Sequence, residues 1–466
     1  MAGHTVEHLV TSLRTTGETV LTSGDPDFET TKSVANLLLD SVEPIAYVEC
    51  TSQASVQAAV RHAADLEVPV AVRGGGYSVG GLGTVADGII VALARLSSID
   101  IDPASAQVRV GPGVRAGQLA AALDTAGLWL SLPVPSGPSV IGAALWGGIG
   151  HTLRKSGFLC DSLIAARIVT ANGDVIEADD DKTPELMWAL RGGGGNFGIV
   201  VEATFQAVPA PRLTVIQSRY TLDDAAEVVS GLVEWGPQLP DDLTVIAMFM
   251  NESHPDAPVA GQTPSLVVNT IYCGTSQDID RVLGPLSTLP PATQRMAIQP
   301  TPQQLRQVSD QHFPYERFAV RTRSGWLDSV TPTAVEQFQE AGRLIPPGNS
   351  ILEIAPLGGA FAVPARPSSA AGRDAAFFCN AMALSTKLGA AADRHHDWLA
   401  SIELPWTATD RPSPVVPGFA TEDQLDTAAP TYGAAMPQLR EVKRRYDPAN
   451  LFHRNLNITP TDHGVQ

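Results

Sequence analysis

The stretch Arg73-Gly74-Gly75-Gly76-Tyr77-Ser78-Val79-Gly80-Gly81 directly follows a short apolar run at 68–72. The apolar run predicts a buried strand, and the triple glycine after it strips the side chains from one length of backbone. Several backbone N–H groups are then free to converge on one anion. The stretch therefore predicts a strand that leads into an anion-binding loop.

Two more glycine clusters follow, at 147–150 and 192–198. A helix is expected before the last of them, at 183–190, where a cap residue and a proline begin it. Three such clusters beside apolar strands favour a long, flat, phosphate-bearing ligand lying against bare backbone. The alternative is that each cluster forms only a set of tight turns.

Two motifs within these clusters match familiar patterns but lack the structural context that those patterns need. The run 193–198 fits the dinucleotide pattern GxGxxG, which requires a strand before it and a helix after it. The expected order here is the reverse, with a strand at 199–205, so a Rossmann site is not predicted. The run 76–80 fits the hydrolase pattern GxSxG, but the glycines after it cannot begin a stable helix, which argues against a serine hydrolase.

Bulk composition restricts the classes of partner. The 466 residues exceed one ordinary core, so two or more domains are expected. The net charge of −18, from 49 acidic and 31 basic side chains, repels nucleic acid phosphates and anionic lipid. No apolar run reaches the roughly 18 residues of a membrane span. We expect neither a nucleic acid nor a membrane as partner.

Cysteine and histidine usage argues against a metal site and for a reducing compartment. Cys50, Cys160, Cys273 and Cys379 form no CxxC pair, and no Cys/His group has the ligand spacing of zinc. The N-terminus lacks the basic and apolar regions of an export signal. We expect no metal, and a cytoplasmic protein with reduced thiols.

Short helices and strands are mixed along the chain without the steady alternation of a doubly wound sheet, which favours the α+β class. A helix capped at Ser52 or Thr51, a helix ended by Gly127 and a hairpin turned at 172–173 are expected before residue 209. The run 209–211 contains two prolines, which interrupt both a ladder and a helix. It marks the expected boundary between two domains.

Four motifs in a fixed order resemble one family. They are 73–78, then 140–150 with 153–161, then 186–200, and the tail 446–458. Their order and flanking residues resemble the FAD-linked oxidoreductases of the vanillyl-alcohol oxidase type, with a PCMH-type FAD-binding domain, in the berberine-bridge-enzyme-like branch. The resemblance covers roughly residues 18–459.

The resemblance implies an α+β fold in which a two-part FAD-binding domain is followed by a substrate domain with an antiparallel sheet flanked by helices. The implied bounds are 1–211 for the FAD domain (core about 40–211), 212–425 for the substrate domain, and 426–466 for a C-terminal segment that returns to the FAD domain. The residues implied to bind FAD are Arg73, Gly74, Gly75, Gly76, Tyr77, Ser78, Gly142, Gly147, Gly148, Gly150, His151, Asp161, Gly193, Gly194, Asn196, Gly198, Ile199, Val200, Asn455 and Asn457.

Three departures from the family pattern concern the flavin. Many members attach FAD through a histidine where this chain has Tyr77, and some add a cysteine in the neighbourhood of 133–138, which contains none. We therefore expect non-covalent FAD; a tyrosyl ether at Tyr77 is the alternative. His151 replaces a large aromatic residue, and could carry a proton, donate to the pyrophosphate or simply pack.

The family's usual catalytic base is also missing from its usual position. The family's usual Tyr-x-Asn stretch corresponds to 413–419, which contains neither residue. The substitute candidates in the substrate domain are His312, Tyr315 and Glu353. Strand alternation puts Glu353 on the face opposite Leu352 and Ile354, which leaves it facing either solvent or the flavin cavity. Because carboxylates are mostly found on the surface, solvent is the favoured face.

The resemblance implies an FAD-dependent oxidoreductase acting on a small, cyclic or aromatic secondary metabolite, as in antibiotic biosynthesis. Hydride would pass to flavin N5, and O₂ or another acceptor would reoxidise the flavin. Two alternatives stay open: a flavin-containing enzyme of non-redox cyclisation or rearrangement, and a resistance protein that binds a metabolite without turnover. The sequence does not fix the oligomeric state.

Overall fold

The first glycine cluster follows the edge strand of a four-stranded sheet. The computed structural model describes residues 2–15, 18–251, 263–274, 279, 282–312, 317–407 and 414–461. The sheet has the order β1-β2-β4-β3, in which β2, β4 and β3 are parallel and β1 is antiparallel. Its strands are β1 (Thr19–Leu21), β2 (Ala46–Glu49), β3 (Val70–Arg73) and β4 (Ile89–Ala92).

Helix α3 (Gln53–Asp65) packs against this sheet, and α1 (Ala2–Thr15) contacts α3. The side chain of Ser52 accepts a hydrogen bond from the N–H of Ser55, so Ser52, one of the two predicted cap residues, caps the helix. Helix α2 (Phe28–Lys32) lies beside β2.

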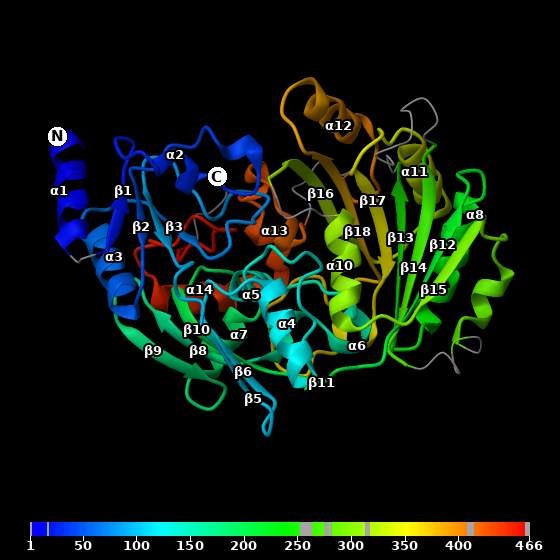
Figure 1. Cartoon of the computed structure of the whole chain (residues 1–466), viewed down its shortest axis with the longest axis horizontal. Coiled ribbons are helices and arrows are strands. Elements are labelled where there is room, and N and C mark those ends of the chain that lie inside the picture. The colour runs from blue at the N-terminus through cyan, green and yellow to red at the C-terminus, as the bar shows by residue number, and fades with distance from the viewer. Residues whose placement is uncertain are drawn as a thin grey trace.

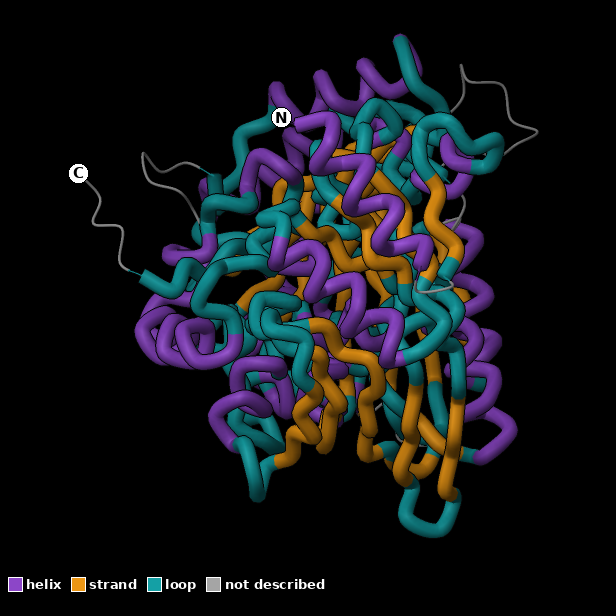
Figure 2. The backbone as a smooth tube through the Cα atoms, turned by 90° about the vertical axis from the view of Figure 1, so that its left-hand side faces the viewer, coloured by secondary structure: helices purple, strands orange, loops and turns teal. Residues whose placement is uncertain are grey.

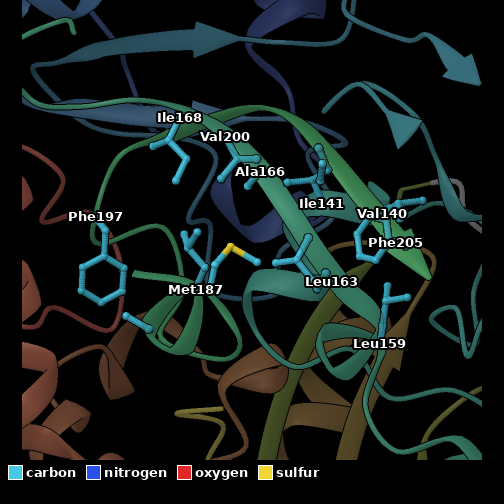
Figure 3. Close-up of a cluster of buried hydrophobic side chains, with 14 of the residues drawn as sticks. Val140, Ile141, Leu159, Leu163, Ala166, Ile168, Met187, Phe197, Val200 and Phe205 are labelled. Atoms are coloured by element: carbon cyan, nitrogen blue, oxygen red, sulfur yellow. The ribbon is translucent and has the colours of Figure 1, made fainter. Parts of the chain in front are cut away.

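A second, five-stranded antiparallel sheet completes the N-terminal half. Its order is β5-β6-β10-β8-β9. Its strands are β5 (Ile99–Asp102), β6 (Gln107–Val110), β8 (Leu163–Val169), β9 (Val175–Asp179) and β10 (Ile199–Gln206). Helix α4 (Ala116–Ala126) ends at Gly127 in the left-handed conformation, as predicted. Helices α5 (Val140–Leu145) and α7 (Pro184–Leu190) bury apolar side chains against β8 and β10 (Figure 3).

The third glycine cluster lies between α7 and β10. The order helix, glycine loop, strand is therefore confirmed, and it is the reverse of a Rossmann unit. After the first cluster the chain forms turns and then β4, so the hydrolase elbow is also excluded.

The C-terminal half is built on a seven-stranded antiparallel sheet of order β15-β12-β14-β13-β17-β18-β16. Its strands are β12 (Thr214–Tyr220), β13 (Leu243–Met250), β14 (Ser265–Tyr272), β15 (Gln294–Ile298), β16 (Ala319–Leu327), β17 (Ile351–Pro356) and β18 (Phe377–Ser385). Three helices, α8 (Ala225–Trp235), α11 (Pro332–Arg343) and α12 (Ala390–Ser401), cover one face. In Figure 1 this sheet lies to the right, with the helix α10 (Pro302–His312) between it and the N-terminal half.

The chain then returns to the N-terminal half through α13 (Ala428–Tyr432) and α14 (Met436–Tyr446), drawn in orange to red among the blue and green elements of Figure 1. The side chain of Asn196, in the third glycine cluster, donates to the carbonyl of Leu456 and accepts from the N–H of Ile458. In the side view, helices lie in front of the strands and along both sides of them (Figure 2).

Among the described residues, no helix is long and apolar enough to cross a membrane. Within the same part of the chain, no group of three or more His, Cys, Asp or Glu side chains could hold a metal ion.

Candidate active site

A cavity of about 830 Å³ lies between the glycine loops and the seven-stranded sheet. The backbone of 74–76, the second cluster at 148–150 and Gly192 of the third cluster all line it. The opposite wall is the sheet face that α8, α11 and α12 leave uncovered. Several strands line it, and β13 contributes Thr244, Ile246, Met248 and Met250. Three loops far apart in the sequence thus meet at one site.

The first loop can lie here only because its residues are glycines. A Cβ on Gly74 would come within 2.5 Å of the Ser139 hydroxyl, and one on Gly75 within 2.7 Å of the Ser139 backbone nitrogen. Gly76 adopts a φ of +68°, which other residues rarely do. The triple glycine therefore packs the loop against 137–139 and leaves its backbone facing the cavity.

The site fits FAD in size and in chemistry. Its volume lies within the ~300–1,000 Å³ that cofactor and ligand sites occupy. Bare backbone lines one side and apolar side chains the other, which suits a molecule with a pyrophosphate and a flat ring.

The predicted FAD residues fall into two groups. Those that line the cavity are Arg73, Gly74, Gly75, Gly76, Tyr77, Ser78, Gly142, Gly148, Gly150 and His151. Those outside its lining are Gly147, Asp161, Gly193, Gly194, Asn196, Gly198, Ile199, Val200, Asn455 and Asn457. Ile199 and Val200 are instead buried in two hydrophobic clusters of the N-terminal half. The role of the second group in FAD binding stays a prediction.

Two residues of these groups have clear structural contacts. The Arg73 Nε donates to the carbonyl of Gly83, and its Nη1 and Nη2 donate to carbonyls within 31–33. Each of its nitrogens is therefore already engaged, so Arg73 brings charge rather than a free hydrogen-bonding edge. Asp161 accepts from Arg373 at 3.1 Å and from the backbone N–H of Phe158 at 2.9 Å, which holds the turn after the second cluster.

Tyr77 lies in the cavity wall, where the attachment histidine of the family would stand. Its ring meets Phe318, the residue just before β16, edge to face, with centroids 5.5 Å apart. Burial raises the pKa of the phenol, which keeps Tyr77 neutral and poorly nucleophilic. Both features favour a packing role for the ring.

His151 is a buried hydrogen-bonded residue at the cavity edge. Its Nε2 lies 2.7 Å from the hydroxyl of Ser309 in α10. Burial, assisted by the nearby charge of Arg306, lowers the pKa of His151 to about 3. With so low a pKa the imidazole binds a proton only weakly near pH 7, so of the three predicted roles, proton carrier is the one that the structure disfavours.

Glu353 lies on β17 and lines the cavity. Its neighbours Leu352 and Ile354 pack against the covering helices, so the predicted alternation holds, but the favoured solvent face was wrong. The side-chain amide of Asn380 on β18 donates to Glu353 at 2.9 Å. Burial raises the pKa of Glu353 to about 7, and the Asn380 hydrogen bond partly opposes this shift.

The other two catalytic candidates cannot be placed in the same way. His312 is the last residue of α10, but its side chain lies outside the described residues, as does the whole of Tyr315. The segment without the family's Tyr-x-Asn does reach the site, because Val416, Pro417, Gly418 and Phe419 line the cavity. Of the three candidates, Glu353 is the one that the structure places there.

Sequence reasoning missed the role of α10. Arg306 donates to the carbonyls of Pro133, Val134 and Pro135 at 2.7–3.1 Å. Asp310 accepts from the N–H of Ser136 at 2.9 Å and from its hydroxyl at 2.6 Å. The helix thus clamps the loop 133–138, which forms part of the cavity wall. No local pattern indicates this contact, because the partners are more than 170 residues apart in the sequence.

Replacing Arg306 with alanine is expected to speed FAD release from the holoenzyme about 30-fold. The change leaves three carbonyls of the cavity wall without a donor, at a cost of ~2 kcal/mol. Recovery of free-flavin fluorescence after dilution measures the rate. Arg343→Ala, which removes an exposed arginine of α11, is the control and should leave the rate unchanged. Equal rates for wild type and Arg306→Ala would show that the clamp does not hold the cofactor.

Comparison with known proteins agrees with this site. Residues 44–179 match the FAD binding domain family, and residues 419–459 match the family described as berberine and berberine like. The chain is 29% identical to (R)-6-hydroxynicotine oxidase of Paenarthrobacter nicotinovorans over 90% of this chain and 91% of that protein. It is 27% identical to an FAD-linked oxidoreductase of Pyricularia oryzae, over 87% and 82% of the two chains.

The fold resembles that of glucooligosaccharide oxidase from Acremonium strictum, with a TM-score of 0.82, 18% identity, and 97% and 99% of the two chains covered. That protein carries a 6-S-cysteinyl, 8α-N1-histidyl FAD. The predicted α+β fold class is confirmed. Loop order, cavity, matching domains and full-length relatives agree, and together they confirm the predicted resemblance to the berberine-bridge-enzyme-like FAD-linked oxidoreductases.

Proposed function

We propose that this oxidoreductase oxidises a small cyclic or aromatic metabolite, with Glu353 as the base that removes an O–H or N–H proton. The single observation that carries the proposal is the position of Glu353 in an apolar cavity, paired with Asn380. A base works best when its pKa lies near the working pH, and burial raises the pKa of Glu353 to about 7. His151, which contacts Ser309 and has a pKa lowered to about 3, is too weak a base for this task.

The chain's own residues would position the substrate, exclude water from it and remove its proton. Bound FAD supplies the acceptor for a hydride at flavin N5. Asn380 fixes the Glu353 carboxylate by a hydrogen bond, which leaves its other oxygen for the substrate proton. Phe158, Trp326 and Phe378 form an aromatic group beside the cavity, and their rings exclude water.

Anaerobic mixing of the holoenzyme with a panel of phenols, aromatic alcohols and aromatic amines tests the proposal. At least one class should bleach the yellow flavin band rapidly. Conversion of a panel compound to an isomer without bleaching would favour the non-redox alternative. Tight binding with neither bleaching nor product would overturn both. Reoxidation of the bleached enzyme with and without O₂ would then identify the acceptor.

We also propose that the FAD is not covalently attached, as expected from Tyr77 and from the cysteine-free loop 133–138. Acid precipitation of the holoenzyme should leave a yellow supernatant over a colourless pellet. A yellow pellet would contradict this, and peptide mass spectrometry of the segment containing Tyr77 would then test the ether. Because the buried residues Cys50, Cys160 and Cys379 are free thiols, we keep the cytoplasm as the proposed compartment.

A further inference from the structure

Two amide side chains interrupt the apolar wall that the seven-stranded sheet presents to the cavity. Gln217 of β12 and Asn269 of β14 are directly paired across the ladder, and both line the cavity. Gln217 Nε2 donates to Asn269 Oδ1 at 3.1 Å. Their other cross-strand neighbours on this face, Met296 of β15 and Ile246 of β13, are apolar. Polar groups at such positions cost stability unless a partner satisfies them.

The bond between the two amides leaves one carbonyl and one NH₂ group available side by side. In the described part of the chain, Gln217 and Asn269 make no other side-chain hydrogen bond. Exchanging O and N in both amides reverses the direction of the bond but leaves the same pair of free groups. The pair therefore presents an adjacent donor and acceptor to the cavity, whichever assignment holds.

An adjacent donor and acceptor match a ligand edge that carries an acceptor beside a donor. The cis-amide edge of a lactam, a cyclic imide or a 2-pyridone has this arrangement, and it can bind both groups at once. An ether or a hydrocarbon would leave at least one of them unpaired in an apolar cavity.

We propose that Gln217 and Asn269 bind the cis-amide edge of the substrate. This inference rests on the proposed function, because it places the amide pair and Glu353 at two ends of one ligand. Asn269 lies two strands from β17, and Glu353 is offset by two residues along it. With strands ~4.8 Å apart and ~3.4 Å per residue, the Cα atoms are about 12 Å apart. The substrate class is thus a lactam-type compound of two or more rings, which presents its oxidisable end to Glu353.

Binding of quinolin-2(1H)-one and of its N-methyl derivative to the holoenzyme tests the proposal. The two probes share a ring system, but methylation removes the donor and blocks the edge. Titrations followed by flavin absorbance or tryptophan fluorescence should give about tenfold tighter binding for the N–H compound. Gln217→Met and Asn269→Leu should each abolish that ratio. Met296→Leu, an apolar exchange beside Gln217, should keep it.

Equal binding of both probes to the wild-type enzyme would overturn the proposal, as would the absence of saturable binding. A variant at Gln217 that weakens both probes equally would also overturn it, since this indicates loss of packing only. Glu353→Gln distinguishes the proposal that the amide pair binds the substrate from the proposal that Glu353 is the base. This variant should keep the tenfold binding ratio and slow flavin reduction. A kept ratio with an unchanged rate of reduction would contradict the role of Glu353 alone, whereas loss of the ratio in the wild-type enzyme would contradict the role of the amide pair.

Discussion

Glu353→Gln is expected to slow reduction of the bound flavin by about 10²–10⁴-fold, with the best reductant of the panel described above. Glutamine keeps the shape of the side chain and a carbonyl near Asn380, but it cannot accept the substrate proton. Stopped-flow absorbance under anaerobic conditions measures the rate directly. Of the described groups that line the cavity, Arg73 and Arg154 donate to backbone carbonyls, and His151, with a pKa lowered to about 3, is too weak a base, so none of these replaces Glu353.

The pH dependence gives this prediction a second readout. The base must be ionised, so the wild-type rate should be constant above pH 7 and fall tenfold per pH unit below it. Glu336→Gln, an exposed glutamate of α11, is the control and should keep both rate and profile. A Glu353→Gln rate within threefold of wild type would exclude Glu353 as the base.

The raised pKa of Glu353 also predicts that stability falls as pH rises, whereas activity rises. Between the ordinary glutamate value of 4.5 and about 7, the folded protein holds a proton on Glu353 that the unfolded chain has lost. The free energy of unfolding therefore falls as pH rises through this window, by about 3 kcal/mol at most. Above pH 7, Glu353→Gln should be at least as stable as wild type, while being much less active.

Lys443→Met is expected to lower the free energy of unfolding by about 3–5 kcal/mol, since it strands a buried carboxylate. Lys443 and Asp447 are both fully buried in the C-terminal segment, with Nζ and Oδ2 2.6 Å apart. Nζ also donates to the backbone carbonyl of Asn196 in the third glycine cluster at 2.9 Å. The substitution therefore loosens the tail from the loop as well. Urea unfolding of the apoprotein and the holoenzyme measures both effects.

Arg445→Met is the matched control for this test. Arg445 lies on the same helix and pairs with Glu185, but its side chain is 64% exposed, so the loss should be below about 1 kcal/mol. Adding Asp447→Asn to Lys443→Met should recover part of the lost stability, because the stranded charge is gone. A loss below 1 kcal/mol for Lys443→Met alone would mean that water reaches Asp447.

Local chemistry explains what the sequence could predict. The helix start at Ser52, the left-handed end at Gly127 and the loop 74–76 depend on a few neighbouring residues, and the structure has all three. The order of elements around the third cluster followed from the same kind of reasoning. The loop 74–76 and the third cluster also carry the family resemblance, which is why the cofactor could be inferred early.

Long-range packing explains what the sequence could not predict. Alternation placed Glu353 opposite Leu352 and Ile354, but only the helices behind the sheet decide which face is buried. The Gln217–Asn269 pair joins residues 52 apart, and their strands give no sign of it in isolation. Ile199 and Val200 of β10 follow the third cluster, and their side chains are buried in two separate cores, a placement that the sequence did not indicate; their contact with the flavin stays a prediction.

Alternate residues along the strands of the seven-stranded sheet serve two different purposes, one on each face. On β13, Leu243, Val245, Ala247 and Phe249 pack against helices, whereas the residues between them line the cavity. Exchanges at the first set alter the core, while exchanges at the second alter only what the cavity accepts. Proteins that share this sheet can therefore evolve new substrates by changing every second residue, while the residues that pack against the helices keep the fold.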